Sequence, residues 1–268
     1  MNYERNNIQE IQGLSQRGKT LSIVDLIKAN TISVDMAAYS MYNIAKEASF
    51  LTAARPGNAG KTTLLACLLT FLPPGNQIIT TSDPSVITNA EKYIENKEPD
   101  KICFLCHEIG SGPWYGYLWG RYVGQMINLI NKGCRVATCI HADTLTELHD
   151  IMVSRELEVS EEDFTLIDLI LFMNLDRSIT GLRRRVSALY KKTSDQDRHK
   201  LIFSWDKSSD EFIKHDKCPE KTDGIDICRD FVNHLVKSGE NDFRWVREKV
   251  LEFYDNLDSS LFLHGDKN

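Results

Sequence analysis

The segment Arg55-Pro56-Gly57-Asn58-Ala59-Gly60-Lys61-Thr62 has the residue types and the spacing of a loop that binds phosphate. Such loops follow the pattern Gly-x-x-x-x-Gly-Lys-Ser/Thr, and only the first position departs from it, because Arg55 replaces glycine there. Gly57 and Gly60 would let backbone N–H groups turn toward phosphate oxygens. Lys61 would add a cation, and the Thr62 hydroxyl would bind Mg²⁺. The residues expected to bind a nucleotide are Gly57, Asn58, Ala59, Gly60, Lys61, Thr62 and Thr63.

Three polar residues stand just after strand-like runs further along the chain: Asp83, Glu108 and His141. A carboxylate such as Glu108, downstream of a phosphate loop, typically orders Mg²⁺ or polarises the attacking water. We expect its strand to neighbour the strand that enters the loop. His141 could contact the γ-phosphate. The alternatives are a solvated carboxylate at a strand end for Glu108 and a structural histidine for His141.

These residues need a scaffold, and the hydrophobic pattern predicts strands that alternate with helices. The predicted strands are 49–53, 77–81, 101–106, 135–140, 166–175, 184–191 and 201–205. The predicted helices are 21–28, 34–46, one that leaves the loop, 85–100, 114–132, 145–155, 225–237 and 243–257, and residues 1–20 are expected to be poorly ordered. Alternation predicts an α/β domain with a mainly parallel central sheet. Ligands bind at the carboxyl ends of such strands, where the loop, Asp83, Glu108 and His141 are expected to meet.

Composition limits the classes of function. The chain has 268 residues, 42% of them hydrophobic and 26% charged, with a formal net charge of −6. These values are typical of a soluble globular protein, and the acidic balance argues against nucleic acid as the main partner. No apolar stretch has the length that crosses a bilayer, and the first residues lack the layout of a signal peptide. We therefore expect a cytoplasmic protein.

The seven cysteines do not predict a metal site. Cys103-x-x-Cys106 lies inside an apolar run, and residues three apart on a strand point to opposite faces of the sheet. Packing in the core is therefore the favoured interpretation. The spacing of His215, Cys218 and Cys228 fits no standard zinc pattern, so these residues are interpreted as structural or incidental.

Four motifs in order resemble those of the secretion and pilus ATPase superfamily, which includes the motors of type II and type IV secretion and of type IV pili. After the phosphate loop, Ser82-Asp83-Pro84 occupies the place of the family's Asp box, and His107-Glu108-Ile109-Gly110 matches its Gly-Glu-Ile/Met-Arg motif. Thr138 to Asp143 fits the family's His box, of the form Thr-x-His-Ala. The resemblance covers about residues 45 to 258, and the C-terminal part is similar to archaeal members.

The resemblance implies a RecA-like P-loop core at residues 49–215, preceded by a helical segment at 1–48 and followed by a helical appendage at 216–268. It implies hydrolysis of ATP with Mg²⁺, with Glu108, Asp83 and His141 as catalytic residues and Thr62 and Glu108 as metal ligands. The implied partners are further copies of the chain in a hexameric ring and a membrane-embedded platform protein, at the cytoplasmic face of the membrane. No nucleic acid is expected.

A ring motor also needs an arginine near the γ-phosphate. The candidates are Arg121, Arg135, Arg177, Arg183, Arg184 and Arg185, and the alternative for each is a solvated charged strand face.

Departures from the family pattern keep a second hypothesis open. Ser82 replaces the Asp-box glutamate, Arg55 replaces the first loop glycine and Gly110 replaces an arginine. Loss of a general base slows turnover by roughly 10²- to 10⁴-fold. The alternative to an active motor is therefore a degenerate nucleotide-binding subunit with a structural or regulatory role. An unrelated P-loop kinase or transferase is disfavoured, because it would not predict His141-Ala142 at this place.

Overall fold

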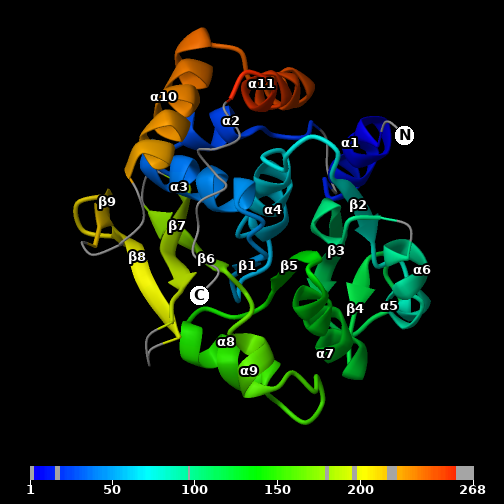
Figure 1. The fold of residues 1–268 in the computed structure, drawn as a ribbon. Coiled ribbons are helices and arrows are strands. Elements are labelled where there is room, and N and C mark those ends of the chain that lie inside the picture. Colours follow the sequence, from blue (N-terminus) through cyan, green and yellow to red (C-terminus); the bar gives the residue numbers. More distant parts are fainter. Residues whose placement is uncertain are drawn as a thin grey trace.

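The computed structural model describes residues 3–15, 19–95, 97–178, 181–194, 198–215 and 222–257. Within these ranges nine strands form a single sheet in the order β2-β3-β5-β1-β6-β7-β8-β9, with the short β4 beside β3 (Figure 1). The strands are β1 (Phe50–Ala53), β2 (Gln77–Thr80), β3 (Ile102–Ile109), β4 (Tyr117–Leu118), β5 (Arg135–Ile140), β6 (Leu169–Ser178), β7 (Gly181–Lys192), β8 (His199–Asp206) and β9 (Glu211–Lys214).

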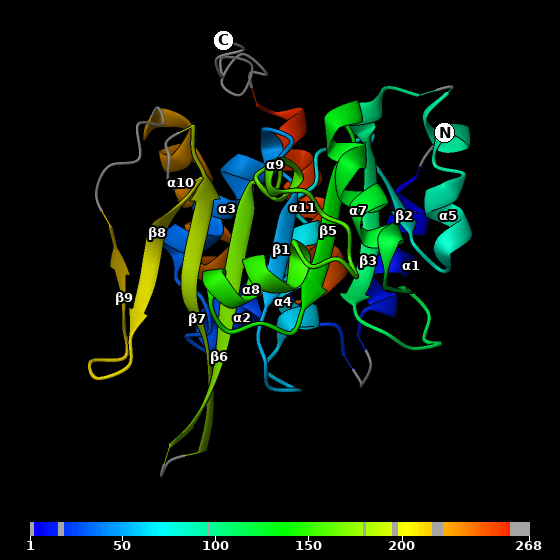
Figure 2. The same ribbon diagram turned by 90° about the horizontal axis from the view of Figure 1, so that it is seen from below.

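The sheet has a parallel half and an antiparallel half. All strand pairs from β2 through β3, β5 and β1 to β6 are parallel, as is the β3–β4 pair. From β6 to β9 the neighbours are antiparallel, and the long β6–β7 hairpin extends well beyond the rest of the sheet (Figure 2). The predicted α/β class with a mainly parallel central sheet is confirmed.

Helices cover both faces of the sheet (Figure 2). One face carries α1 (Glu4–Gly13), α2 (Ile23–Lys28), α3 (Val34–Ala45), α4 (Lys61–Leu69), α10 (Thr222–Ser238) and α11 (Phe243–Asp255). The other carries α5 (Pro84–Thr88), α6 (Glu91–Ile94), α7 (Arg121–Asn128), α8 (Leu145–Met152) and α9 (Glu161–Phe164). Each face has its own hydrophobic cluster, so the fold is a three-layer sandwich with the sheet in the middle.

The strand β3 shows why the parallel half is buried on both sides. Its residues Ile102 to Cys106 are all fully buried, and successive side chains enter opposite clusters. Cys103 packs with the cluster under α4, whereas Cys106 packs with the cluster under α7. Burial raises the pKa of both thiols, to about 12 and about 11. The interpretation of this pair as core residues is confirmed, and the six cysteines of the described ranges are free and buried. Cys218 lies outside those ranges.

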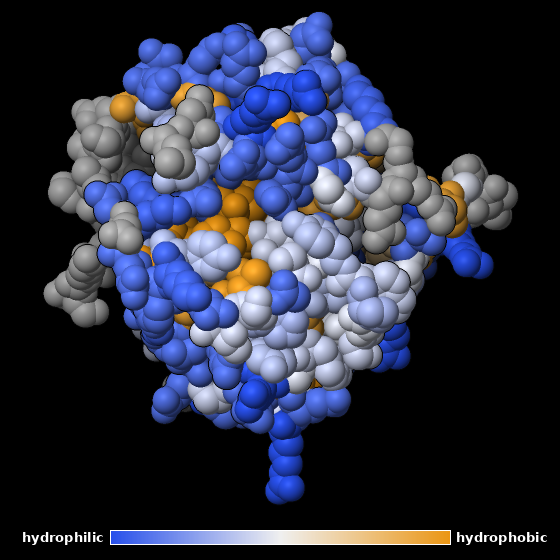
Figure 3. Space-filling view, turned by 90° about the vertical axis from the view of Figure 1, so that its right-hand side faces the viewer, coloured by the Kyte–Doolittle hydropathy of each residue, from blue (hydrophilic) through white to orange (hydrophobic). Residues whose placement is uncertain are grey.

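The first segment of the chain corrects one expectation, because residues 4–13 form the helix α1. Its Asn7 side chain is 1% exposed and completes the hydrogen bonding of the edge strand β2. The Asn7 amide donates to the Asn76 carbonyl (2.8 Å) and accepts from the Ile78 amide (2.9 Å). Ile11, also on α1, packs into the hydrophobic cluster on this face of the sheet. Figure 3 looks onto this edge of the molecule, where mostly hydrophilic residues surround a narrow strip of hydrophobic ones.

A second correction concerns the predicted helix 114–132, which begins only at Arg121. Residues 110–120 instead form a loop that contains β4. Gly112, Gly116 and Gly120 have positive φ angles of 154°, 78° and 69°, and runs of such residues do not continue a helix. The strand β3 ends at Ile109 and not at the predicted residue 106. Its last two residues, Glu108 and Ile109, pair with β4 in this loop. The predicted helix 85–100 is likewise divided, into α5, α6 and a 3₁₀ turn at Pro99–Lys101.

The helices near both ends of the chain share one hydrophobic cluster with the sheet. α10 packs against α3, and Gly224 allows this approach, since a Cβ atom there would lie 2.4 Å from the Tyr42 ring. α11 is held to α1 by the ion pair of Arg247 with Glu4, where the Nη2–Oε1 distance is 2.7 Å. The division into parts at residues 48 and 215 stays a prediction. None of the helices in the described ranges has the length and apolar character needed to cross a membrane.

Candidate functional site

The loop between β1 and α4 has the backbone of a tight turn. Gly60 adopts a left-handed conformation (φ 101°) directly before the first residue of α4, and Asn58 is also left-handed (φ 62°). Asparagine tolerates this region better than most residues with a side chain. Gly57 does not have a positive φ, so Asn58 and Gly60 are the left-handed residues of this loop, and the role expected of Gly57 toward phosphate stays a prediction.

Lys61, Glu108 and His141 converge at the carboxyl edge of the sheet. Lys61 Nζ lies 3.2 Å from His141 Nε2 and 3.8 Å from Glu108 Oε2, and Glu108 Oε1 lies 3.3 Å from His141 Nε2. The Lys61 side chain is only 6% exposed. A buried ammonium group needs such acceptors, because unpaired burial of a charge is costly. The three residues come from separate elements, so the fold creates this cluster.

The strand order corrects one detail of the expected arrangement. β3, which carries Glu108, does not neighbour β1, because β5 lies between them. His141 follows directly on β5 and therefore stands between the loop lysine and the carboxylate. The histidine belongs to the cluster for this reason.

Both ring nitrogens of His141 have polar neighbours. Its Nδ1 lies 2.7 Å from the carbonyl oxygen of Arg55, which can only accept. Lys61 Nζ lies 3.3 Å from Nδ1 and 3.2 Å from Nε2, and Nε2 also faces the Glu108 carboxylate, so His141 contacts the loop backbone, the lysine and the carboxylate together.

Arg55, the residue that replaces the first glycine of the motif, ties the loop to α8. Its guanidinium group forms an ion pair with Glu147 on α8, where Nε lies 3.1 Å from Oε1, and its backbone amide donates to Asp143 (2.7 Å). Glu147 also accepts from the Asp143 amide. The hydrogen bond from that amide, and then the one from Arg55, lower the pKa of Glu147. Because Arg55 does not have a positive φ, this position does not require glycine.

Tyr117 covers Glu108, and it is a site residue that sequence reasoning missed. The two residues are paired neighbours on β4 and β3. Burial, followed by the charge of Glu108, raises the pKa of Tyr117 to about 12. The signal was present in Gly110-Ser111-Gly112-Pro113, a combination that predicts a loop in place of the helix expected there.

A cavity of about 680 Å³ lies over the loop. A volume of this size can hold a nucleotide. All seven loop residues predicted to bind a nucleotide line it: Gly57, Asn58, Ala59, Gly60, Lys61, Thr62 and Thr63. Glu108 and His141 line it as well. Backbone amides and the lysine suit an anion, whereas the hydroxyl of Thr62 and the carboxylate of Glu108 are oxygen donors of the kind that Mg²⁺ prefers.

Asp83 is not one of the described residues that line this cavity. It stands after β2, which is separated from β1 by β3 and β5. Its carboxylate caps α5, accepting from the Ser85 amide at 2.8 Å. Hydrogen bonds from Ser85 lower the pKa of Asp83.

Of the arginines considered as partners of the γ-phosphate, three line the cavity and three lie elsewhere. Arg135 is 1% exposed at the start of β5, where it donates to the carbonyls of Ile44 and Asp100, at the edge of the sheet opposite the cavity. Arg121 stacks on Tyr122 and lines a different cleft. Arg177 is exposed on β6. The remaining three, Arg183, Arg184 and Arg185, line the cavity.

Comparisons with known proteins give a likeness of structure alone. No protein-family model matches the chain, and no curated protein matches it. The VirB11 ATPase of the Brucella suis type IV secretion system, crystallised with sulphate, aligns with a TM-score of 0.43 and 15% identity, covering 69% of this chain and 55% of that one. The Legionella pneumophila ATPase DotB aligns with a TM-score of 0.38 and 13% identity, covering 65% and 49%. The chain thus spans about half the length of these solved structures.

Proposed function

We propose that this chain is a P-loop ATPase with a RecA-like core, of the secretion and pilus motor type. The observation that carries the proposal is the convergence of Lys61, His141 and Glu108 beside a loop whose residues fit the phosphate-binding pattern. A cation, a histidine and a carboxylate at the ends of three neighbouring parallel strands supply the groups that phosphoryl transfer uses.

The proposed roles follow from position. The N–H groups of the loop and the Lys61 ammonium group bind the phosphate chain of ATP. Thr62 and Glu108 hold Mg²⁺, which neutralises charge on the phosphates when bound. In this proposal Glu108 also orients the attacking water; its side chain is 15% exposed and its strand neighbour on β4 is Tyr117. His141 contributes an imidazole between Lys61 and Glu108, with Nε2 within 3.3 Å of the Glu108 carboxylate.

One observation favours the second candidate, a nucleotide-binding subunit with little hydrolysis. Asp83 caps α5 and lies outside the cavity, and its neighbour Ser82 has no carboxylate. A catalytic role for Asp83 would therefore need a rearrangement around β2. If Glu108 alone is the catalytic carboxylate, the position of Asp83 and the serine at position 82 do not affect the rate of hydrolysis.

The proposal extends to partners through the sequence resemblance. We propose that copies of the chain assemble into a ring, with six as the expected number, and that the ring acts on a membrane-embedded platform protein. Light scattering of the purified protein with and without MgATP measures the stoichiometry directly.

The deciding experiment is steady-state release of phosphate from MgATP over a range of protein concentrations, which allows for assembly. An ATPase turns over, and Glu108→Gln abolishes turnover while it keeps ATP binding, because the amide keeps the shape and removes the charge. Glu162→Gln, at an exposed position on α9 that does not line the cavity, is the matched control. Parental protein that binds ATP without turnover would establish the second candidate. Absence of ATP binding would refute both.

A further inference from the structure

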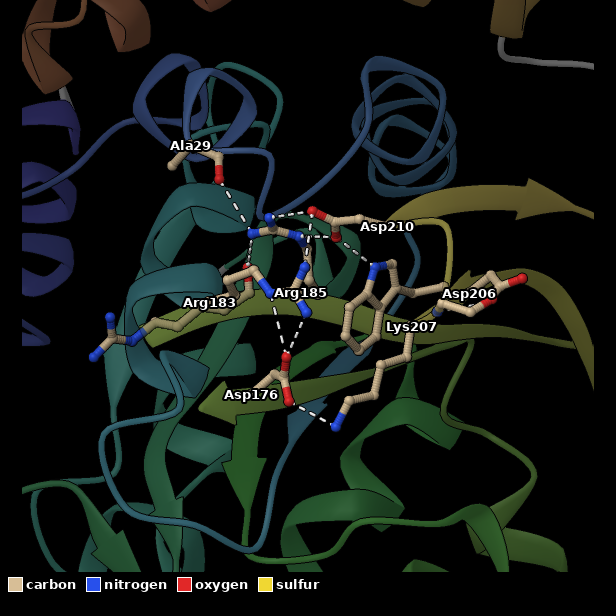
Figure 4. A network of polar contacts seen from close by, with 10 residues as sticks. Ala29, Asp176, Arg183, Arg185, Asp206, Lys207 and Asp210 are labelled. Atoms are coloured by element: carbon tan, nitrogen blue, oxygen red, sulfur yellow. Dashed lines mark hydrogen bonds and ion pairs between the residues drawn. The ribbon is translucent and has the colours of Figure 1, made fainter. Parts of the chain in front are cut away.

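The strand β7 carries three consecutive arginines, Arg183, Arg184 and Arg185, and they are not equivalent. Side chains alternate between the faces of a strand, so Arg183 and Arg185 share one face and Arg184 takes the other. Their contacts differ accordingly, as Figure 4 shows for the first face.

Arg183 and Arg185 are neutralised by carboxylates. Arg185 forms a two-pronged pair with Asp210, with Nε–Oδ1 at 2.8 Å and Nη2–Oδ2 at 2.9 Å (Figure 4). Arg183 donates twice to Asp176, at 3.2 and 2.6 Å from Oδ2. The Arg185 hydrogen bond contributes most to lowering the pKa of Asp210. Paired guanidinium groups of this kind have their strongest donors occupied.

Arg184 lies over the phosphate loop. Its Nε donates to the carbonyl oxygen of Asn58 at 2.9 Å, and no carboxylate of the described residues forms an ion pair with it. A Cβ atom on Gly60 would lie 3.5 Å from Cδ of Arg184, an ordinary contact distance, so the Arg184 side chain passes directly beside Gly60.

The charge balance of the cavity favours a second cation there. Lys61 is partly compensated by Glu108 at 3.8 Å, whereas the phosphate chain of a nucleoside triphosphate carries several negative charges. Guanidinium groups bind phosphate through two parallel donors, and the two terminal nitrogens of Arg184 remain for this after Nε has bonded to Asn58.

Resting on the proposed function, we propose that Arg184 binds the phosphate chain of the nucleotide held by the loop of its own chain. The site then has two cations from one chain, Lys61 from α4 and Arg184 from β7. The pairs Arg183–Asp176 and Arg185–Asp210 anchor β7 so that Arg184 stays over the loop.

The test is calorimetric binding of MgATP to a set of variants at position 184. Arg184→Ala and Arg184→Gln should weaken binding about tenfold or more, the usual effect of losing a charge-assisted contact. Arg184→Lys should retain most of the affinity, because it keeps the charge. Arg177→Ala is the matched control, an exposed arginine on the same hairpin outside the cavity, and it should bind as the parent does.

The glutamine variant separates binding from a role in loop shape, since it keeps a donor for the Asn58 carbonyl and loses the charge. Parental affinity in Arg184→Gln would overturn the proposal, and so would parental affinity in Arg184→Ala. Arg184 is partly exposed, so these variants should keep the parental melting temperature. If the parent itself fails to bind ATP, the proposed function is refuted. A different result would refute only the role of Arg184. In that result the parent binds ATP and Lys61→Ala loses binding, but the position-184 variants bind as the parent does.

Discussion

The ammonium group of Lys61 lies 3.2 Å from Nε2 and 3.3 Å from Nδ1 of His141, so a residue of α4 and a residue that follows β5 are in direct polar contact. This contact brings the loop cation to the centre of the cluster with Glu108. The lysine can exchange its contact with the imidazole for phosphate oxygens, which are stronger acceptors for an ammonium group.

Replacing Lys61 by alanine should weaken MgATP binding about tenfold or more, because the lost charge-assisted contact is worth roughly 1.5–3 kcal/mol. Calorimetry measures the affinity. Lys101→Ala is the control, a half-exposed lysine before β3 at the opposite edge of the sheet. An unchanged dissociation constant in Lys61→Ala would contradict the assignment of the loop.

Replacing Ser82 by glutamate should leave the rate of ATP turnover nearly unchanged. The new carboxylate would stand after β2, with β3 and β5 between it and the loop strand. Phosphate release under saturating MgATP tests this, with Ser85→Glu on α5 as a control for added charge. A tenfold rise in rate for Ser82→Glu alone would show that this segment reaches the nucleotide, and it would favour the degenerate-subunit hypothesis.

His107 should make stability fall as the pH falls. Burial lowers its pKa to about 4, whereas an unfolded histidine titrates near 6.5. Between these values the unfolded chain binds a proton that the folded chain does not, so stability present at neutral pH is lost on acidification.

The measurement for His107 is the free energy of unfolding by denaturant at about pH 7 and about pH 4.5, for the parent and for His107→Phe. The parent should lose roughly 2–3 kcal/mol more than the variant over this interval. The phenyl ring keeps the edge-to-face contact with Tyr115 and does not titrate. Equal losses in the two proteins would show that His107 is not the group responsible.

Replacing Arg247 by methionine should destabilise the fold by roughly 3–5 kcal/mol, the usual cost of removing one partner from a buried ion pair. Its side chain is 2% exposed, pairs with Glu4 and donates to the carbonyls of Thr70 and Leu72. Chemical denaturation measures the change. Lys249→Met, at a partly exposed position on the same helix, should stay within about 0.5 kcal/mol of the parent, and a similar loss in both variants would count against the argument.

The parallel half of the sheet was predictable because its strands are short apolar runs that end in polar residues. β5, predicted at 135–140, has these bounds in the structure. The helix α1 was not predictable in this way, since its main anchor is the polar Asn7, whose role depends on the backbone of β2, about seventy residues later in the chain. The apolar spacing over 114–132 predicted one helix, but the glycines with positive φ set the backbone before Arg121.

The candidate site was predictable to the extent that its residues follow strands. The loop residues, Glu108 and His141 line one cavity, whereas Asp83 does not. The difference arises from strand order, which the sequence does not specify: β2 is the outermost strand and β5 lies beside β1. Tyr117 and the separate roles of Arg183, Arg184 and Arg185 depend on pairing between strands, and they became visible only in the structure.

The position of β5 between β1 and β3 also bears on how much this chain tolerates insertions. Neighbouring strands lie about 4.8 Å apart whatever connects them, so the separation of Lys61, His141 and Glu108 depends on the ladder of the sheet. The connection at 110–116 is constrained as well, because the Gly116 carbonyl accepts hydrogen bonds from the amides of His107 and Glu108. A one-residue slip of β5 would turn His141 to the opposite face and dissolve the cluster. An insertion is therefore most harmful where it changes the register of one six-residue strand.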